Sequence, residues 1–219
     1  MAPGFRALSI VATRTDTGIG DEAVLTEVRV AALAAAQAGA PAWAGTHLAD
    51  WADVFRRFGA KPQRTPCSAQ ALRDRVLKSG EFPELDPVVD LYNAISIKYA
   101  VPVGGENMLA YQGSPRLVVA DGSESFDTMK NGAPAVECPE RGEVVWRDDV
   151  GVTCRRWNWR QGVRTRLDVK ATAMWFVLES LPTMPLEALE QAGDELMTGL
   201  RSMFGSIRFQ QALLQKEGA

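Results

Sequence analysis

Amides, a carboxylate and two glycines flank one proline of the chain in a pattern suited to a ligand pocket. The candidate residues around Pro102 are Asn93, Gly104, Gly105, Glu106 and Asn107. A glycine pair permits a tight turn and lets a ligand approach the main chain, while amide and carboxylate groups can orient a water or an amino group. The spacing therefore predicts a pocket wall at a glycine turn. Taken alone, an asparagine in an apolar helical stripe is also typical of an amide that ties down a neighbouring loop.

Tryptophans alternate with arginines in a second stretch, CRRWNWRQGVRTRLD. A strand over its first half would place Trp157, Trp159 and Gln161 on one face, and Asn158 and Arg160 on the other. Tryptophan stacks on bases or amino-acid side chains, and arginine binds phosphate or carboxylate through paired hydrogen bonds. The stretch predicts either one wall of a pocket or a tryptophan-anchored core with its arginines in solvent.

Basic residues are concentrated in two places, although the formal net charge of the 219-residue chain is −3. Within the tryptophan-rich stretch, Arg155, Arg156 and Arg164 are candidate contacts to phosphate. A second cluster comprises Arg56, Arg57, Lys61, Arg64, Arg73, Arg75 and Lys78. Either cluster could bind RNA if its members converge, and either could instead be a solvated helix surface. The overall charge does not indicate a nucleic-acid binder, and DNA is not an expected partner.

Most common catalytic signatures are absent from the sequence. His47 is the only histidine, and Cys67, Cys138 and Cys154 lack the spacing of a disulfide framework or a zinc site. There is no Walker loop, HExxH motif or dinucleotide fingerprint after a strand. A hydrolase that pairs His47 with Cys67 or Cys154 stays an alternative without a local signature. We expect neither a metal nor a cofactor.

Helical periodicity dominates the first half of the chain and strand patterns the second. After an opening strand at 5–12, helices are expected from Asp21 towards Gly39 and over 46–59, 65–77 and 86–101. Strands are expected over 116–120, 143–147, 151–157, 163–169 and 173–179, followed by a helix over 185–203 and a short element over 206–214. This order predicts an α+β fold with a largely antiparallel or mixed sheet and flanking helices, in one domain over 1–219. No segment is long and apolar enough for a membrane, so we expect a cytoplasmic protein.

Three stretches together carry a family resemblance: VVDLYNAISIKYAVPVGGENM, SPRLVVADGSESF and GEVVWRDDVGVTCRRWNWRQGVRTRLDVKATAMWFVLES. They resemble the B3/B4 domain of the phenylalanyl-tRNA synthetase β subunit and, more closely, free-standing bacterial B3/B4 proteins. The resemblance is strongest over residues 51–180. It implies an α+β editing-domain fold and hydrolysis, in trans, of an amino acid wrongly esterified to tRNA. The chain is too short to be a complete aminoacyl-tRNA synthetase.

The resemblance also implies roles for the candidate residues. In the synthetase pattern a histidine and a final aspartate follow the proline, whereas this chain has no histidine there and ends the motif in Asn107. A changed amino-acid specificity is therefore expected. We expect the two glycines to offer main-chain donors and the asparagines to orient a water or the amino group. Glu106 or Glu124 would bind the ammonium of an aminoacyl-tRNA. The resemblance further implies that Arg155, Arg156 and Arg164 contact the tRNA.

Two other functions remain open from the sequence. One is a non-catalytic module that binds tRNA or an amino-acid-like ligand, because no nucleophile with its base is recognisable. The other is a hydrolase of small esters unrelated to tRNA.

Overall fold

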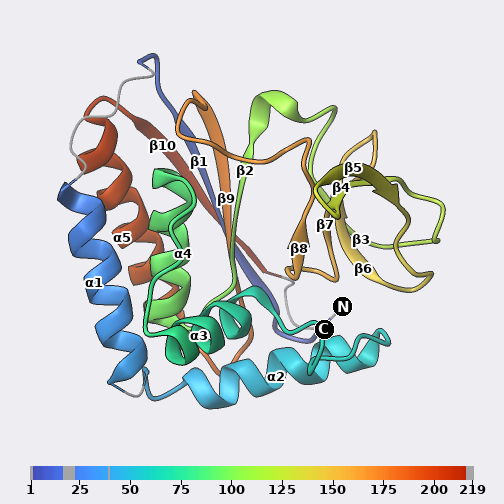
Figure 1. Ribbon diagram of the computed structural model, residues 1–219, viewed down its shortest axis with the longest axis horizontal. Coiled ribbons are helices and arrows are strands. Elements are labelled where there is room, and N and C mark those ends of the chain that lie inside the picture. The colour runs from blue at the N-terminus through green and yellow to red at the C-terminus, as the bar shows by residue number, and fades with distance from the viewer. Residues whose placement is uncertain (1, 17–22, 39, 216–219) are drawn as a thin grey trace.

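The computed structural model describes residues 2–16, 23–38 and 40–215, which form two β-sheets and flanking helices (Figure 1). The helices are α1 (Ala23–Gln37), α2 (Ala44–Arg57), α3 (Ser68–Ser79), α4 (Pro87–Tyr99), the 3₁₀ turn η1 (Met108–Ala110) and α5 (Leu186–Phe204). The strands are β1 (Arg6–Thr13), β2 (Val103–Asn107), β3 (Arg116–Val119), β4 (Phe126–Lys130), β5 (Ala133–Glu137), β6 (Val144–Arg147), β7 (Val152–Arg155), β8 (Arg160–Gln161), β9 (Ala173–Ser180) and β10 (Arg208–Gln215). The expected α+β fold is confirmed.

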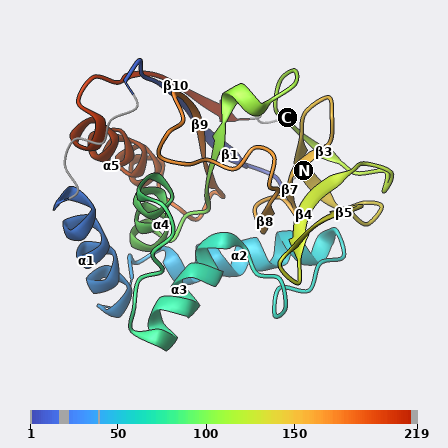
Figure 2. The ribbon, with the colours of Figure 1, turned by 45° about the horizontal axis from the view of Figure 1, so that its top comes forward.

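The first sheet has the strand order β10-β1-β9-β2, with every neighbouring pair antiparallel. Helices α1, α4 and α5 lie on one face of this sheet (Figures 1 and 2). Side chains alternate along β9, so Phe176 and Leu178 join the core beneath the helices. Trp175 and Val177 project from the opposite face, where Trp175 meets Trp146 of β6 with ring centroids 5.2 Å apart. The first sheet is therefore covered on both faces.

The second sheet follows the order β3-β6-β7-β4-β5, and β8 pairs with β7. Its pairs are antiparallel except for β4 with β7, so the sheet is mixed. The β4–β5 hairpin turns at Asn131 and Gly132, both with positive φ. An Asn-Gly pair of this kind favours the two-residue turn of a hairpin, a signal that the sequence prediction overlooked.

Two helices of the predicted set position the region between the sheets. Helix α4 begins after Asp86, whose side chain accepts a hydrogen bond of 2.9 Å from the Val88 N–H, and it has proline in its first turn. Helix α2 buries Trp51 and Phe55 beneath the second sheet, and the Trp51 ring lies 5.4 Å from that of Trp157. The aromatic face of α2 thus supports the tryptophan-rich stretch from below.

Four sequence expectations about elements need correction or qualification. The segment 103–107 is strand β2 rather than a tight turn, and 163–169 forms no strand beyond a single bridge at Arg166. The element expected over 206–214 is strand β10, which pairs along β1. The expected cap at Asp21 lies outside the described residues. Within those residues no helix combines the length and apolar character needed to cross a membrane.

Candidate functional site

A pocket of about 220 Å³ lies between the edge of the first sheet and the β7–β8 region of the second. Strands β2 and β9, Trp146 of β6 and the segment from Cys154 to Gln161 form its walls. The first turn of α3 and the middle of α4 complete the lining. Pockets for drug-sized ligands usually measure about 300–1,000 Å³, so this one suits a smaller group. The two stretches singled out in the sequence therefore form facing walls of one cavity.

Glu106 presents a buried carboxyl to this pocket from strand β2. The residue is only 4% exposed, and its Oε2 has no hydrogen-bond partner among the described residues. Burial raises the pKa of Glu106 to about 8, although Thr153, Gln161 and Thr165 favour the charged form. The two threonine hydroxyls themselves make no hydrogen bond of normal geometry to a described residue. Glu106 is thus a carboxyl that can take up or release a proton near neutral pH.

Glu179 is a second buried carboxyl in the pocket, on the neighbouring strand β9, and is 1% exposed. Its Oε1 accepts hydrogen bonds from the indole N–H groups of Trp146, at 2.9 Å, and Trp157, at 3.1 Å. Its Oε2 accepts one from the Asn158 amide at 2.9 Å. Burial raises the pKa of Glu179 to about 7, and these three donors oppose the rise. The sequence analysis missed this residue, although an acid ending an otherwise apolar strand was a visible signal.

A strained turn brings the tryptophan-rich stretch into the pocket. Arg156 and Trp157 both have positive φ, 47° and 66°, a region that bulky side chains rarely adopt. The turn is held by a 2.6 Å hydrogen bond from the Trp157 N–H to the Val144 carbonyl and by the indole contact to Glu179. Strain of this kind persists where the surroundings fix it and is frequent at functional sites. Because the turn interrupts strand alternation, the predicted division of these side chains between two sheet faces is wrong.

Most of the predicted site residues line the pocket: Asn93, Gly104, Glu106, Trp157, Asn158, Trp159, Arg160 and Gln161. Asn93 makes no side-chain hydrogen bond within the described part of the chain, so the loop-tying role is not supported. Gln161 donates a 2.7 Å hydrogen bond to the Gly105 carbonyl and thereby joins the two walls. The site also contains Tyr92, Trp146 and Trp175, which were not predicted.

Two members of the glycine motif do not line the pocket. A Cβ at Gly105 would come within 2.7 Å of the Tyr92 ring, so this residue is glycine because the ring packs against the strand. Asn107 accepts a 3.0 Å hydrogen bond from the Leu109 N–H and thereby caps η1. Neither Gly104 nor Gly105 has a positive φ, so the expectation of a tight turn at this glycine pair is corrected. Gly104 keeps the pocket wall free of a side chain.

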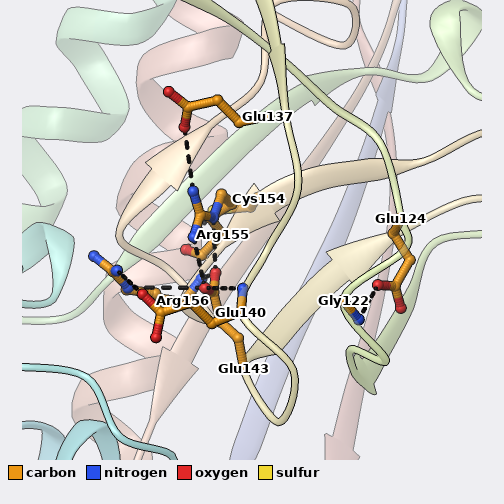
Figure 3. A network of polar contacts seen from close by, with 8 residues as sticks. All are labelled: Gly122, Glu124, Glu137, Glu140, Glu143, Cys154, Arg155 and Arg156. Carbon is orange, nitrogen blue, oxygen red and sulfur yellow. Dashed lines mark hydrogen bonds and ion pairs between the residues drawn. The ribbon is translucent and has the colours of Figure 1, made fainter.

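Glu124 is not a pocket residue, contrary to the sequence prediction. Its two carboxylate oxygens accept hydrogen bonds of 3.0 Å from the N–H groups of Asp121 and Gly122. Figure 3 shows the Gly122 contact to one side of the arginine cluster described next. Glu124 therefore stabilises the turn before β4, and an ion pair of 3.8 Å with Arg147 adds to this role.

Arg155 is not available to bind phosphate. Its Nε and Nη2 donate to the two oxygens of buried Glu143 at 3.0 and 2.8 Å, and its Nη1 lies 3.3 Å from Glu137 (Figure 3). Arg156 lies 3.8 Å from Glu143 through its Nε, and its guanidinium covers the Trp159 ring at 4.5 Å. These arginines shape the pocket wall from behind, and the predicted tRNA contact of Arg155 is corrected.

Arg164 is also engaged within the fold. Its Nη1 and Nη2 each lie within 2.9 Å of buried Asp148, and Nη1 donates to the Ala110 carbonyl at 2.8 Å. This bidentate pair, together with three backbone donors, lowers the pKa of Asp148 to about 2 against the effect of burial. Arg164 therefore stabilises the fold through Asp148 and a backbone carbonyl, and its contact to tRNA stays a prediction.

The cysteine–histidine alternative has no geometric support. His47 is fully buried, with Nδ1 2.9 Å from the Ala100 carbonyl and Nε2 accepting from the Leu181 N–H at 3.1 Å. Burial lowers the pKa of His47 to about 4, raises the pKa of Cys67 to about 12 and raises that of Cys154 well above its usual value. His47 is therefore a structural histidine. The described residues contain no group of three or more metal-ligating side chains.

Comparison with known proteins identifies the family. No curated protein is significantly similar to the chain. Residues 50–188, more than half of the chain, match the B3/4 domain. The match spans the helices, strands and turn that form the pocket. The chain therefore belongs to the B3/4 domain family.

Proposed function

We propose that the chain removes a wrong amino acid from tRNA in trans by hydrolysing the aminoacyl ester, with the acyl group held in the pocket. The observation that carries the proposal is the Glu106 carboxyl, which is buried, lacks a partner at Oε2 and faces the cavity. Family membership is compatible with a tRNA-related function, and the resemblance to the synthetase editing domain supports the ester as substrate.

The proposed reaction uses water and no covalent enzyme intermediate. The water oxygen bonds to the ester carbonyl carbon, and ionised Glu106 accepts a proton from that water molecule. The bond between that carbon and the ribose oxygen then breaks, and the ribose oxygen takes the proton to become a hydroxyl. A pKa of about 8 makes Glu106 a stronger base than an exposed carboxylate, at the expense of its ionised fraction at neutral pH.

Polar groups of the pocket can orient the acyl group. Asn93 has an amide without an internal partner, and Asn158 Oδ1 is buried without a hydrogen bond. The Asn93 amide can accept from the α-ammonium of the substrate, and Asn158, which lies beside Glu179, can accept from another N–H group of the acyl part. Gly104 leaves space for the ester beside the strand, where a side chain would otherwise project.

The tRNA phosphates are proposed to lie along α2 and α3. Arg56, Arg57, Lys61 and Arg64 are exposed around the end of α2 and the turn that follows, and Arg75 and Lys78 are exposed on α3. Helix α3 also contributes Ser68, Ala71 and Leu72 to the pocket, so this basic surface adjoins the site. Arg73 is excluded from it because it is buried and donates to the Ile97 carbonyl at 2.6 Å.

The test is release of amino acid from a panel of misacylated tRNAs by the wild-type chain and by Glu106→Gln. Loss of a general base is expected to slow hydrolysis about 10²–10⁴-fold. A double charge reversal, Arg57→Glu with Lys61→Glu, should weaken tRNA deacylation and its salt dependence while sparing a small aminoacyl ester. Absence of release above buffer from every tRNA would contradict the proposal.

A non-catalytic module for an amino-acid-like ligand is the second candidate. Among the described lining residues the thiol is that of Cys154, and burial raises its pKa well above its usual value, which disfavours a thiolate nucleophile. This candidate predicts saturable binding of aminoacyl-tRNA with no release of the amino acid. Equal behaviour of wild type and Glu106→Gln in a turnover assay would support it.

A further inference from the structure

The second buried carboxyl of the pocket lacks a cationic partner. All three donors to Glu179 are neutral: two indole N–H groups and the amide of Asn158. A carboxylate has about four acceptor positions, so one position on Oε2 stays available. None of the ion pairs between described residues includes Glu179 or Glu106. The pocket thus contains two carboxyls, and no described residue forms an ion pair with either of them.

The cationic side chains near the pocket bind other groups of the described chain than the two carboxyls. Arg160 is the cationic side chain among the described lining residues, and its Nη2 donates to the Met129 carbonyl at 3.1 Å. Arg164 favours ionisation of Glu106 from a distance but is bound to Asp148. An unpaired buried carboxylate is unfavourable, and a positively charged ligand would relieve it.

The unsatisfied buried atoms among the described lining residues are two acceptors and the Ser68 hydroxyl, which can donate or accept. Glu106 Oε2 and Asn158 Oδ1 belong to residues that are 4% and 8% exposed, and neither atom has a hydrogen-bond partner within the described residues. The indole rings of Trp157, Trp159 and Trp175 supply apolar wall between these polar points. Such a lining suits a ligand with an apolar stem and N–H donors at both ends.

The spacing of the two carboxyls fits an extended stem. Glu106 pairs with Trp175 across β2 and β9, and Glu179 lies four positions further along β9. At about 3.3 Å per residue, the backbones are roughly 13 Å apart along the strands. Both side chains project from the same face of the sheet and line the same pocket, so their carboxyls are separated mainly along the strands. A hydrogen bond of about 2.8 Å at each end leaves room for an unbranched chain of several methylenes.

We propose that the acyl group selected by this pocket is that of a diamino acid such as lysine or ornithine. The side-chain ammonium binds Glu179 beside Asn158, and the α-ammonium lies at the Glu106 end near Asn93. This inference rests on the proposed function for the ester and adds the substrate class.

The test compares acyl groups on one tRNA, charged by a ribozyme with lysine, ornithine or norleucine. Norleucine has the stem of lysine without the second ammonium and is the matched control. A hydrogen bond between charged groups corresponds to roughly a ten- to hundred-fold preference, so lysyl and ornithyl esters should be hydrolysed faster than the norleucyl ester by this factor. Equal rates for lysine and norleucine would overturn the inference and leave the proposed ester hydrolysis intact.

A variant locates the preference at Glu179. In Glu179→Gln the introduced NH₂ group would face the Asn158 NH₂ group. A flip of the Asn158 amide turns its Oδ1, which has no partner among the described residues, towards the glutamine NH₂ and restores the hydrogen bond. This variant should therefore fold, which thermal unfolding checks, and its ratio of lysyl to norleucyl rates should fall to near one. An unchanged ratio would contradict the assignment.

Failure of the proposed hydrolysis has a separate signature. If no ester of any amino acid is released, binding of lysinamide and norleucinamide is measured by calorimetry. A preference of about ten-fold or more for lysinamide would support the cation site on its own. No preference, or no binding of either amide, would overturn it.

Discussion

Replacement of Glu106 by glutamine should change how the stability of the fold depends on pH. Glutamine has the shape of the protonated acid and cannot ionise, so the variant is a reference for the neutral state of this position. The Glu106 carboxyl is 4% exposed, and burial raises its pKa from 4.5 to about 8. The folded chain therefore binds a proton at Glu106 over a pH range in which the unfolded chain has released it.

The sign and size of the effect follow from this proton balance. Between pH 4.5 and 8 the folded state holds more protons at Glu106, so the free energy of unfolding falls as the pH rises through this window. Each step of one in pKa corresponds to about 1.4 kcal/mol. The rise in the pKa of Glu106 from 4.5 to about 8 therefore corresponds to a loss of about 5 kcal/mol in the free energy of unfolding as the pH increases from below 4.5 to above 8.

The assay is denaturant unfolding of wild type and Glu106→Gln at pH 4.5, 6, 7.5 and 9. The quantity of interest is the difference between the two free energies of unfolding at each pH, in which the titration of all other groups cancels. We expect the glutamine variant to gain several kcal/mol over wild type between the lowest and highest pH. A difference that does not vary with pH would refute the argument that Glu106 is buried without a charge partner.

Two further perturbations test packing and charge around the site. Gly105→Ala should destabilise the fold by about 1–3 kcal/mol in a urea titration, because the added Cβ would lie 2.7 Å from the Tyr92 ring. The control Gly104→Ala, whose added Cβ has its nearest neighbour at 3.4 Å, should change stability by less than about 1 kcal/mol in the same assay. Glu143→Ala leaves buried Arg155 without its main partner and should lower thermal and chemical stability by about 3–5 kcal/mol. The control Glu140→Ala removes an exposed acid and should change the free energy of unfolding by no more than about 0.5 kcal/mol. Equal losses of stability in Glu143→Ala and Glu140→Ala would contradict the role given to the buried Arg155–Glu143 pair.

Local sequence signals predicted the helices and several strands well. The cap at Asp86 with Pro87 gave the start of α4, and the apolar periodicity of 185–203 gave α5 within a residue at each end. The glycine-rich and tryptophan-rich stretches were each predicted as a pocket wall, and the structure brings them together in one cavity. These features depend on neighbours a few positions apart in the chain, which a single sequence displays.

The errors concern contacts between distant segments. The glycine pair was assigned to a turn, but Gly105 is required by the Tyr92 ring, which reaches the strand from α4. Arg155 was assigned to phosphate, but it is bound by Glu143 and Glu137, which lie 12 and 18 residues away along the chain. Strand β2 pairs with β9 about seventy residues later, and no local pattern specifies that register.

The register of β2 against β9 connects the fold to the proposed chemistry. Because side chains alternate along both strands, Glu106 and Glu179 project from the same face, while Gly105 and Phe176 face the helices. A slip of β2 by one residue would turn Glu106 towards the apolar core and bring Gly105 into the pocket.

Glu179 has two tasks that substitutions cannot fully separate. It accepts hydrogen bonds from the strained turn at Trp157 and Asn158, and it offers the remaining acceptor position to a ligand. Removal of its carboxyl would therefore alter the pocket wall as well as its charge. The comparison of lysyl and norleucyl esters changes only the substrate, so it measures the preference for a second ammonium without altering the pocket wall, and Glu179→Gln then assigns that preference to Glu179. For the same reason, a preference for lysine in the unmodified chain would be stronger evidence than any loss of activity in a variant.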